Sequence, residues 1–296
     1  MRNRIMLSAA ASVFAFSLLW GAAGSLEPTS WTFTSIDVPG ADLTVARDMN
    51  PAGQIVGACT MPDANRGFVD RGFLLSNGVF TLIEIGDGDD ARGINPEGDI
   101  VGWFASEDEG WISHGYLWRE GNVTQFDYPG ADYTIAEDIN AAGDIVGFYG
   151  LGDTEHGFLL RDGVYTTIDP PDALLTNARG VNDRGDIVGL YDIVDQDGIY
   201  RAHGFLRSRD GAFTTIDGHG SPSSSANGIN TRGQIVGTCR GFPFGFLLSQ
   251  GKYTTIQIPG LIRAAPHKIT SDGQHIVGVY RDDQGSVHGF MLAASR

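Results

Sequence analysis

Basic side chains, cysteine and long apolar runs are all scarce in this chain of 296 residues. Lysine and arginine number 20 against 36 acidic residues, which leaves a formal charge of −16. A protein this acidic repels a phosphate backbone and gains little from counterion release, so we exclude nucleic acid as its main partner. After the first 24 residues, no segment is apolar and long enough to span a membrane. Any anion site must therefore be local.

Recognisable catalytic phrases are also missing. The chain contains no Gly-x-Ser-x-Gly, no His-Glu-x-x-His and no phosphate-binding loop. Glycine, in contrast, is abundant: its 42 residues are roughly twice the average usage, although the 12 prolines keep the combined content below that of low-complexity chains. With 42% hydrophobic residues, the sequence predicts a folded, turn-rich protein with a large core, in one large domain or two small ones.

The first 24 residues have the pattern of an export signal. Arg2 and Arg4 precede an apolar run from Ile5 to Trp20, and small residues follow it. A membrane anchor is the alternative, but the run is shorter than the roughly 20 residues that cross a bilayer. We predict a signal peptide at 1–24, a short linker at 25–30, and an exported mature protein in the periplasm or outside the cell, without a membrane span.

The phrase Ile-Asn-x-x-Gly-x-Ile-Val-Gly recurs six times with small variations. Its second residue marks each repeat, at Asn50, Asn95, Asn140, Asn182, Asn230 and Thr270. The spacings of 45, 45, 42, 48 and 40 residues divide the mature chain into six units. Asn-x-x-Gly turns and alternating β-branched and aromatic residues predict four short strands in each unit, and no helical pattern follows the signal peptide.

Four strands in each repeat of this length are typical of a β-propeller blade. The two ends of the chain are complementary, because residues 31–38 resemble a fourth strand while the last unit stops at its third, 288–292. We therefore expect an all-β, six-bladed propeller over 31–292, with four antiparallel strands per blade and residues 31–38 completing the last blade. A short tail, 293–296, follows. An open solenoid is the alternative, but it would need atypical capping repeats, and none is visible.

The repeated phrases resemble a known family. Gly-x-Ile-Val-Gly followed by His-Gly-Phe-Leu at His156, His203 and His288, and by His-Gly-Tyr-Leu at His114, is similar to the bacterial extracellular HAF repeats. That name refers to His-Ala-Phe, and glycine stands in the middle here, so the match is to a variant. The resemblance covers most of the chain and implies an exported bacterial repeat protein. It implies no established activity and assigns no functional residue.

Several reactive side chains have ordinary structural explanations. The four histidines open third strands of different units, which favours inter-blade structural residues over a metal site. Acidic clusters such as Glu107–Gly110 and Asp195–Gly198 lack the dense oxygen ligands of a calcium loop, which favours solvated turns. Cys59 and Cys239 lie in the first and fifth units, a whole blade apart and beyond the roughly 7 Å that a disulfide spans. We predict two buried free thiols, no metal and no cofactor.

One column of the repeat varies as a binding site would. It lies three residues before the marker and contains Arg47, Arg92, Glu137, Arg179, Asn227 and His267. Because first strands lie nearest the axis of a propeller, we expect these side chains to form a ring at one channel mouth. The arginines, with His267 as a further cation, would make a positive spot that binds a ligand. The alternative is a structural belt in which Arg47 or Arg92 pairs with Asp48, Glu137 or Asp138.

The sequence favours a non-enzymatic function. We expect an exported binding or scaffold propeller that presents one loop-rich face to a glycan, a small anion or a protein partner. Its support is the lack of a catalytic phrase. Loop aromatics at the same end, Trp103, Trp111, Tyr200, Phe242 and Phe244, either stack on sugars or seal blade edges.

The alternative is a carbohydrate-active enzyme, a lyase or hydrolase on acidic polysaccharide. Arginines would neutralise a uronate carboxylate while His267 or Tyr133 abstracts a proton. For a hydrolase, the nearest carboxylates are Glu137 and Asp138, but adjacent residues of a strand point to opposite faces. The fold alone does not choose between these functions, because propellers serve many.

Overall fold

The computed structural model describes residues 6–8, 30–221, 223–258, 260–261 and 263–295. The expected signal peptide and linker lie outside the described residues, except for 6–8 and Ser30. Regular structure here is almost entirely strand, with two short 3-10 helices, η1 (Glu107–Glu109) and η2 (Gly218–Gly220). Among these residues no helix has the length and apolar character needed to cross a membrane.

Hydrogen bonds group the described strands into five sheets. One sheet has five strands, which pair in the order β1 (Met6–Ser8), β6 (Val79–Ile83), β5 (Gly67–Ser76), β4 (Ile55–Asp63) and β3 (Leu43–Met49). Three sheets have four strands each. The first pairs in the order β10 (Asn122–Phe126), β9 (Ser113–Arg119), β8 (Ile100–Ala105) and β7 (Gly88–Ile94), and the second in the order β19 (Ser224–Ile229), β20 (Ile235–Cys239), β21 (Gly245–Ser249) and β22 (Lys252–Ile256). The third pairs in the order β2 (Ser30–Ile36), β25 (Val287–Ser295), β24 (His275–Arg281) and β23 (Arg263–Ile269). The last sheet has eight strands, in chain order β11 (Tyr133–Ile139), β12 (Ile145–Leu151), β13 (Thr154–Arg161), β14 (Val164–Ile168), β15 (Leu175–Val181), β16 (Ile187–Val194), β17 (Tyr200–Arg207) and β18 (Phe213–Ile216).

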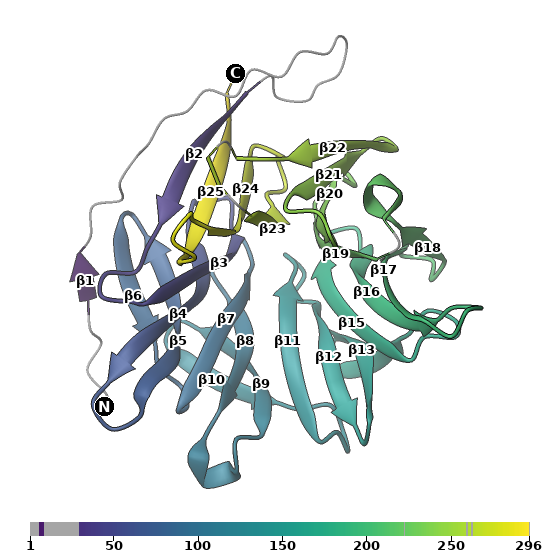
Figure 1. The fold of residues 1–296 in the computed structure, drawn as a ribbon. Helices are drawn as coiled ribbons and strands as arrows, with labels where there is room; N and C mark the ends of the chain where they lie inside the picture. The colour runs from purple at the N-terminus through teal and green to yellow at the C-terminus, as the bar shows by residue number, and fades with distance from the viewer. Residues whose placement is uncertain (1–5, 9–29, 222, 259, 262, 296) are drawn as a thin grey trace.

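The sheets stand around a central axis, as Figure 1 shows. The strands nearest the axis are β3, β7, β11, β15, β19 and β23; each contacts the next, and β23 contacts β3. The ends of the chain meet as expected, because β2 pairs antiparallel with β25, from Ser30 opposite Ser295 to Ile36 opposite Gly289. The fold is therefore an all-β propeller with a closed ring, and an open solenoid is excluded.

The predicted six-bladed architecture is wrong as a description of the hydrogen-bonded sheets. We expected six separate four-stranded blades, and the described strands form five sheets, only three of which have four strands. A parallel bridge between Glu155 of β13 and Leu175 of β15 joins two repeat units into the eight-stranded sheet. In another sheet β1 pairs with β6 and adds a fifth strand. Repeat periodicity locates strands within a unit, but it does not report bridges between units or strands added from outside the repeats.

Two repeated residue types explain how the inner strands hold together. The glycine that ends each phrase allows the second strand to lie very close to the first: a Cβ there would lie 1.9–2.2 Å from a backbone oxygen, at Gly57, Gly102, Gly147, Gly189, Gly237 and Gly278. The marker asparagine serves two turns. Asn140 Oδ1 accepts backbone hydrogen bonds from Ala142 (3.0 Å) and Asp144 (2.9 Å), and its Nδ2 donates to the carbonyl of Asn182 in the next repeat (3.2 Å).

Candidate functional site

The predicted polar column lies on a β-bulge in every inner strand. The register between β3 and β4 jumps from Ala46 to Asp48, so Arg47 has no partner across the strands. The other five inner strands jump at the equivalent place, which leaves Arg92, Glu137, Arg179, Asn227 and His267 unpaired. Bulges re-aim side chains and are frequent beside functional sites. The bulge is the local reason that these residues share one direction.

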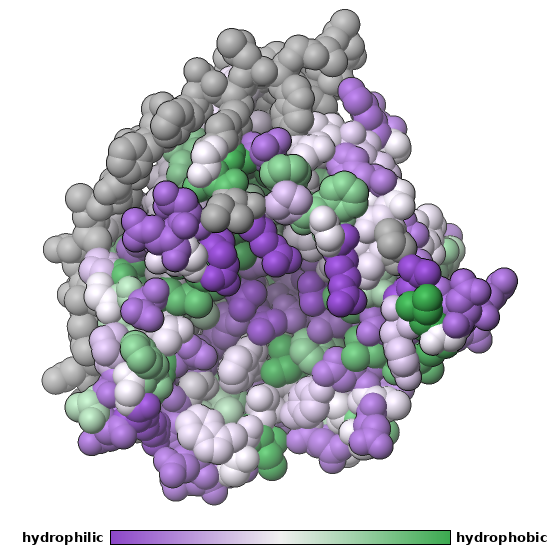
Figure 2. All heavy atoms as spheres, in the orientation of Figure 1, coloured by the Kyte–Doolittle hydropathy of each residue, from purple (hydrophilic) through white to green (hydrophobic). Residues whose placement is uncertain are grey.

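All six column residues line one cavity of about 330 Å³, which we call the central pocket. The other residues that line it are Thr238, Arg263, Ala265 and Lys268. Hydrophilic side chains also gather around the hollow at the centre of the face in Figure 2. The sequence-derived ring is therefore assembled in the fold. Whether it binds a ligand is a separate question, which depends on the charges inside it.

Two of the three arginines are neutralised within the ring. Arg47 Nη2 lies 2.8 Å from Asp90 Oδ2, and Arg92 Nε lies 3.1 Å from the same oxygen. Arg92 also pairs with Glu137 of the next repeat. Burial alone would raise the pKa of Asp90, but Arg47 and Arg92 hold it below its usual range. The belt interpretation thus applies to part of the ring, although Arg47 pairs with Asp90 and not with Asp48 or Asp138.

Arg179 differs from the other two arginines. Its Nη1 donates to Ser225 Oγ and to Asn227 Oδ1, each at 3.0 Å, and both are neutral acceptors. Within the described part of the chain, no carboxylate comes within ion-pair distance of it. Burial, together with the nearby cations Arg92 and Arg47, lowers the pKa of Arg179 despite the opposing charge of Glu137. The Arg179 guanidinium therefore carries a positive charge without a counter-ion, and it faces the central pocket.

His267 is not the additional cation that we expected. Its Nδ1 lies 2.9 Å from the carbonyl oxygen of Ala46, which can only accept, so Nδ1 carries the proton and Nε2 has the free lone pair. Burial and the charge of Arg47 lower the pKa of His267 to about 3. The imidazole is therefore neutral at physiological pH and contributes hydrogen bonding rather than charge.

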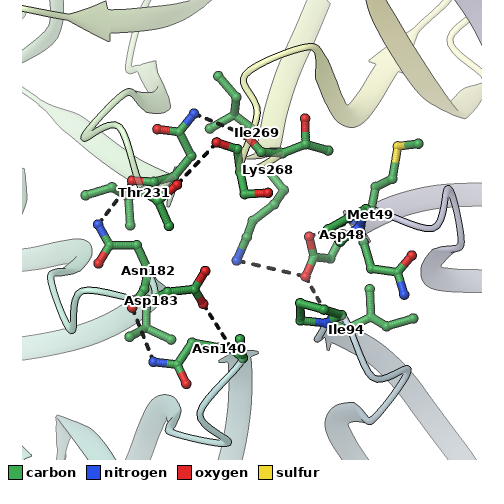
Figure 3. A pocket seen from close by; sticks show the side chains of 18 of the residues that line it. Asp48, Met49, Ile94, Asn140, Asn182, Asp183, Thr231, Lys268 and Ile269 are labelled. Atoms are coloured by element: carbon green, nitrogen blue, oxygen red, sulfur yellow. Dashed lines mark hydrogen bonds and ion pairs between the residues drawn. The ribbon is translucent and has the colours of Figure 1, made fainter.

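A buried ion cluster forms the floor of the central pocket. Lys268 lines this pocket and also a smaller cavity of about 70 Å³, so it lies between the two. Its Nζ pairs with Asp138 and lies 3.9 Å from Asp48 Oδ2, as the close view in Figure 3 shows for Asp48. Each aspartate also accepts a backbone hydrogen bond from another repeat, Asp48 from Ile94 (2.9 Å) and Asp138 from Val181 (2.7 Å). These acids belong to the floor and not to the ring.

The charges that line the central pocket do not cancel. Asp90 and Glu137 balance Arg47 and Arg92, while Lys268 has its own acids in the floor. Arg179 and Arg263 remain, and neither makes an ion pair with any residue that the structure describes. The central pocket of a protein with a formal charge of −16 is therefore lined by two arginines that have no acidic partner of their own.

Sequence reasoning missed three residues of this site, Asp90, Lys268 and Arg263. Asp90 and Arg263 stand in repeat positions where the other units have uncharged residues, and Lys268 stands where the other units have aspartate or glycine. The signal was therefore present, but it lay in columns other than the one that we selected. The bulge matters here, because it lets residues two apart, such as Asp90 and Arg92, meet at one oxygen.

Other residues proposed from the sequence lie elsewhere. Tyr133 is not part of the central pocket, and its hydroxyl donates a hydrogen bond to Glu155. Burial, and to a lesser extent this hydrogen bond, raise the pKa of Tyr133. Trp103 and Trp111 line a separate cavity of about 550 Å³ between two neighbouring repeats, where Arg66 lies over the Trp111 ring. These aromatics are therefore not at the axis.

The third-strand histidines contact acids of their own sheet rather than a neighbouring blade, so the inter-blade prediction is wrong. The Nδ1-to-oxygen pairs are His114–Asp127 (3.0 Å), His156–Asp169 (2.8 Å), His203–Asp217 (3.0 Å) and His288–Asp37 (2.7 Å). Where arginine replaces histidine, Arg71 instead lies 3.8 Å from Glu84. These pairs join the third strand to the end of the fourth.

The prediction of two free, buried cysteines, Cys59 and Cys239, is confirmed.

Three solved structures with a similar fold are distant from this chain in sequence. A gluconolactonase from Xanthomonas campestris has a TM-score of 0.57 and 10% identity, covering 99% of this chain and 100% of that one. The β-propeller domain of the Trilobed protease from Pyrococcus furiosus has a TM-score of 0.56 and 10% identity, covering 86% of this chain and 95% of that one. A catalytically inactive variant of virginiamycin B lyase from Staphylococcus aureus, whose structure was determined with quinupristin, has a TM-score of 0.52 and 12% identity. The match covers 88% of this chain and 99% of that one.

At such low identity these similarities support the propeller fold alone. No family model matches the chain. No curated protein matches it either. The resemblance to HAF repeats stays a prediction.

Proposed function

We propose that this chain is an exported binding protein whose central pocket takes a small ligand with a carboxylate, such as an acidic sugar. The observation that supports this most strongly is Arg179. A partly buried guanidinium without a counter-ion is unfavourable, whereas one that meets a carboxylate gains two parallel charge-assisted hydrogen bonds. Ser225 and Asn227 fix one side of the Arg179 guanidinium, which orients the remaining donors.

The size and surroundings of the central pocket suit this ligand class. Its volume of about 330 Å³ is near the lower end for small-molecule sites, which fits one sugar ring better than a larger compound. Most of the column residues are partly buried, so charge pairing is stronger there than in bulk water. Asn227 and neutral His267 add polar groups for ligand hydroxyls.

The same geometry favours binding over catalysis. A general base works best with a pKa near the working pH, but that of His267 is about 3. Glu137 is paired with Arg92, and Tyr133 lies outside the pocket. Two of the similar structures are named as a lactonase and a lyase, which keeps the enzyme alternative worth testing. The candidate bases here are not prepared for proton abstraction.

Calorimetric titration with galacturonate, and with galactose as the neutral match, tests the proposal. We expect the wild type to bind galacturonate at least about tenfold more tightly than galactose, and Arg179→Gln to remove this preference, since tenfold corresponds to about 1.4 kcal/mol. Arg209→Gln, an exposed arginine outside the pockets described here, is the control. Equal affinity for the two sugars, or unchanged binding by a folded Arg179→Gln protein, would refute the proposal. Formation of an unsaturated uronate from a 1,4-linked oligogalacturonate, in which the sugar on C4 is the leaving group, would support a lyase instead.

Export rests on the sequence pattern of residues 1–24 and has its own test. We expect the protein, expressed with its leader in a bacterial host, to be recovered outside the cytoplasm and to begin near residue 25. Recovery of the uncleaved chain in the cytoplasm would contradict export without affecting the binding proposal.

A further inference from the structure

A second cavity opens directly from the central pocket. It has a volume of about 210 Å³ and shares Arg263 and Ala265 with the central pocket. Its other lining residues come from β24 and β25 of the last sheet: Val279, Tyr280, Arg281 and Val287. We call this cavity the side pocket. Because two residues line both cavities, the central and side pockets form one continuous surface that runs from the axis over the last repeat.

The side pocket contains two arginines that face each other. Arg263 of β23 and Arg281 of β24 are direct partners across the antiparallel strands. Like charges in this arrangement destabilise a sheet. Both side chains are exposed, and neither forms an ion pair within the part of the chain that the structure describes. Arg281 donates to the carbonyl oxygen of Gly285, which carries no charge. The pair therefore lacks a counter-ion.

This pair is a departure from the repeat. At the position of Arg263, seven residues before the marker, the other units have only uncharged residues: Leu43, Gly88, Tyr133, Leu175 and Ser223. The architecture of the unit therefore does not require an arginine there. The departure occurs beside the central pocket, which already contains the unpaired guanidinium of Arg179.

We propose that the central and side pockets together bind an acidic oligosaccharide, with one carboxylate at Arg179 and a second between Arg263 and Arg281. This inference rests on the proposed function for its first subsite. A bound carboxylate supplies the counter-ion that the arginine pair lacks, and guanidinium groups match carboxylate geometry. Ala265, Val279 and Val287 provide an apolar wall for a sugar ring.

The test compares ligand lengths, using galacturonate and trigalacturonate in calorimetry. We expect the wild type to bind the trimer about tenfold more tightly than the monomer. Arg281→Gln, which alters the side pocket alone, is expected to reduce this ratio to about twofold or less, and Arg281→Glu to reduce it further by pairing with Arg263. Arg209→Gln is the control and keeps the wild-type ratio. Removing one of two like charges leaves folding intact, which thermal melting checks.

The outcomes separate the two proposals. If the wild type binds monomer and trimer equally, or if both Arg281 variants retain the wild-type ratio, the two-pocket inference is overturned while monomer binding stands. If trimer binding depends on Arg281 but monomer binding is unaffected by Arg179→Gln, the proposed function of the central pocket fails instead. If neither ligand binds the wild type, both are overturned.

Discussion

Asp89 provides a test of the repeat itself, because it is a buried carboxylate in a position that other units fill with a hydroxyl. The equivalent residues are Thr44, Thr134, Thr176 and Ser224, with Ala264 in the last unit. Thr44 Oγ1 accepts the backbone hydrogen bond of Val38 (3.0 Å), and Asp89 serves the same purpose by accepting from Gly72 (2.8 Å) and Ile85 (3.4 Å). The perturbation is Asp89→Thr.

The pH dependence of this variant follows from the pKa of Asp89. The side chain is 0% exposed, and burial raises its pKa from 3.8 to about 7, against the opposing effects of the Gly72 hydrogen bond and the charge of Arg71. Between these values the folded state holds a proton that the unfolded state has lost. The contribution of Asp89 to stability is therefore complete below its pKa in the unfolded state, and it is lost as the pH rises through its pKa in the folded state. About three pKa units correspond to about 4 kcal/mol.

Urea denaturation of wild type and Asp89→Thr at about pH 4 and about pH 8 measures this difference. Near pH 4 we expect the variant to be less stable by about 1 kcal/mol, the value of a lost hydrogen bond. Near pH 8 we expect it to be more stable than the wild type by about 3 kcal/mol, because the charged buried carboxylate is gone. Asp153→Asn, an exposed acid, corrects for the change in net charge. A stability difference that is the same at both pH values would refute the reasoning.

Three further predictions concern the axis and the core. Lys268→Met leaves Asp48 and Asp138 buried without their cation and should lower the free energy of unfolding in denaturant by about 3–5 kcal/mol. The control Lys252→Met, at an exposed position, should change it by less than about 0.5 kcal/mol. A loss under about 1 kcal/mol for Lys268→Met would contradict the floor cluster. Gly102→Ala places a Cβ 1.9 Å from the Asp90 carbonyl oxygen and should lower stability by about 3 kcal/mol or more, so a variant that unfolds at the wild-type midpoint would disprove the close approach. Burial raises the pKa of Cys59 to about 12, so a thiol reagent should react slowly with the native protein and with two groups after unfolding without reductant; finding none in the unfolded monomer would show a disulfide.

The sequence was sufficient to predict the strands, the ring closure and the membership of the polar ring. Each of these depends on a pattern within the chain: the Asn-x-x-Gly turns, the complementary ends and the variable column beginning at Arg47. All six column residues line the central pocket. Asn50 and its equivalents were correctly attributed to structure, since each binds its own turn and several reach the next repeat.

Contacts between repeats were not predictable in the same way. The bridge from Glu155 to Leu175 depends on how two neighbouring units approach, which strand periodicity does not report. The bulge at Arg47 decides that it meets Asp90 rather than Asp48, and a one-residue shift of this kind changes which side chains share a face. The neutral state of His267 follows from its burial beside Arg47, a property of the assembled pocket.

A crystal structure of the protein with bound galacturonate tests the central claim most directly. We predict that the ligand lies in the central pocket with its carboxylate oxygens at hydrogen-bond distance from the Arg179 guanidinium, and with hydroxyl groups near Asn227 and His267. A galacturonate found only outside this pocket, or an Arg179 that has no contact with the carboxylate at saturating ligand, would contradict the account.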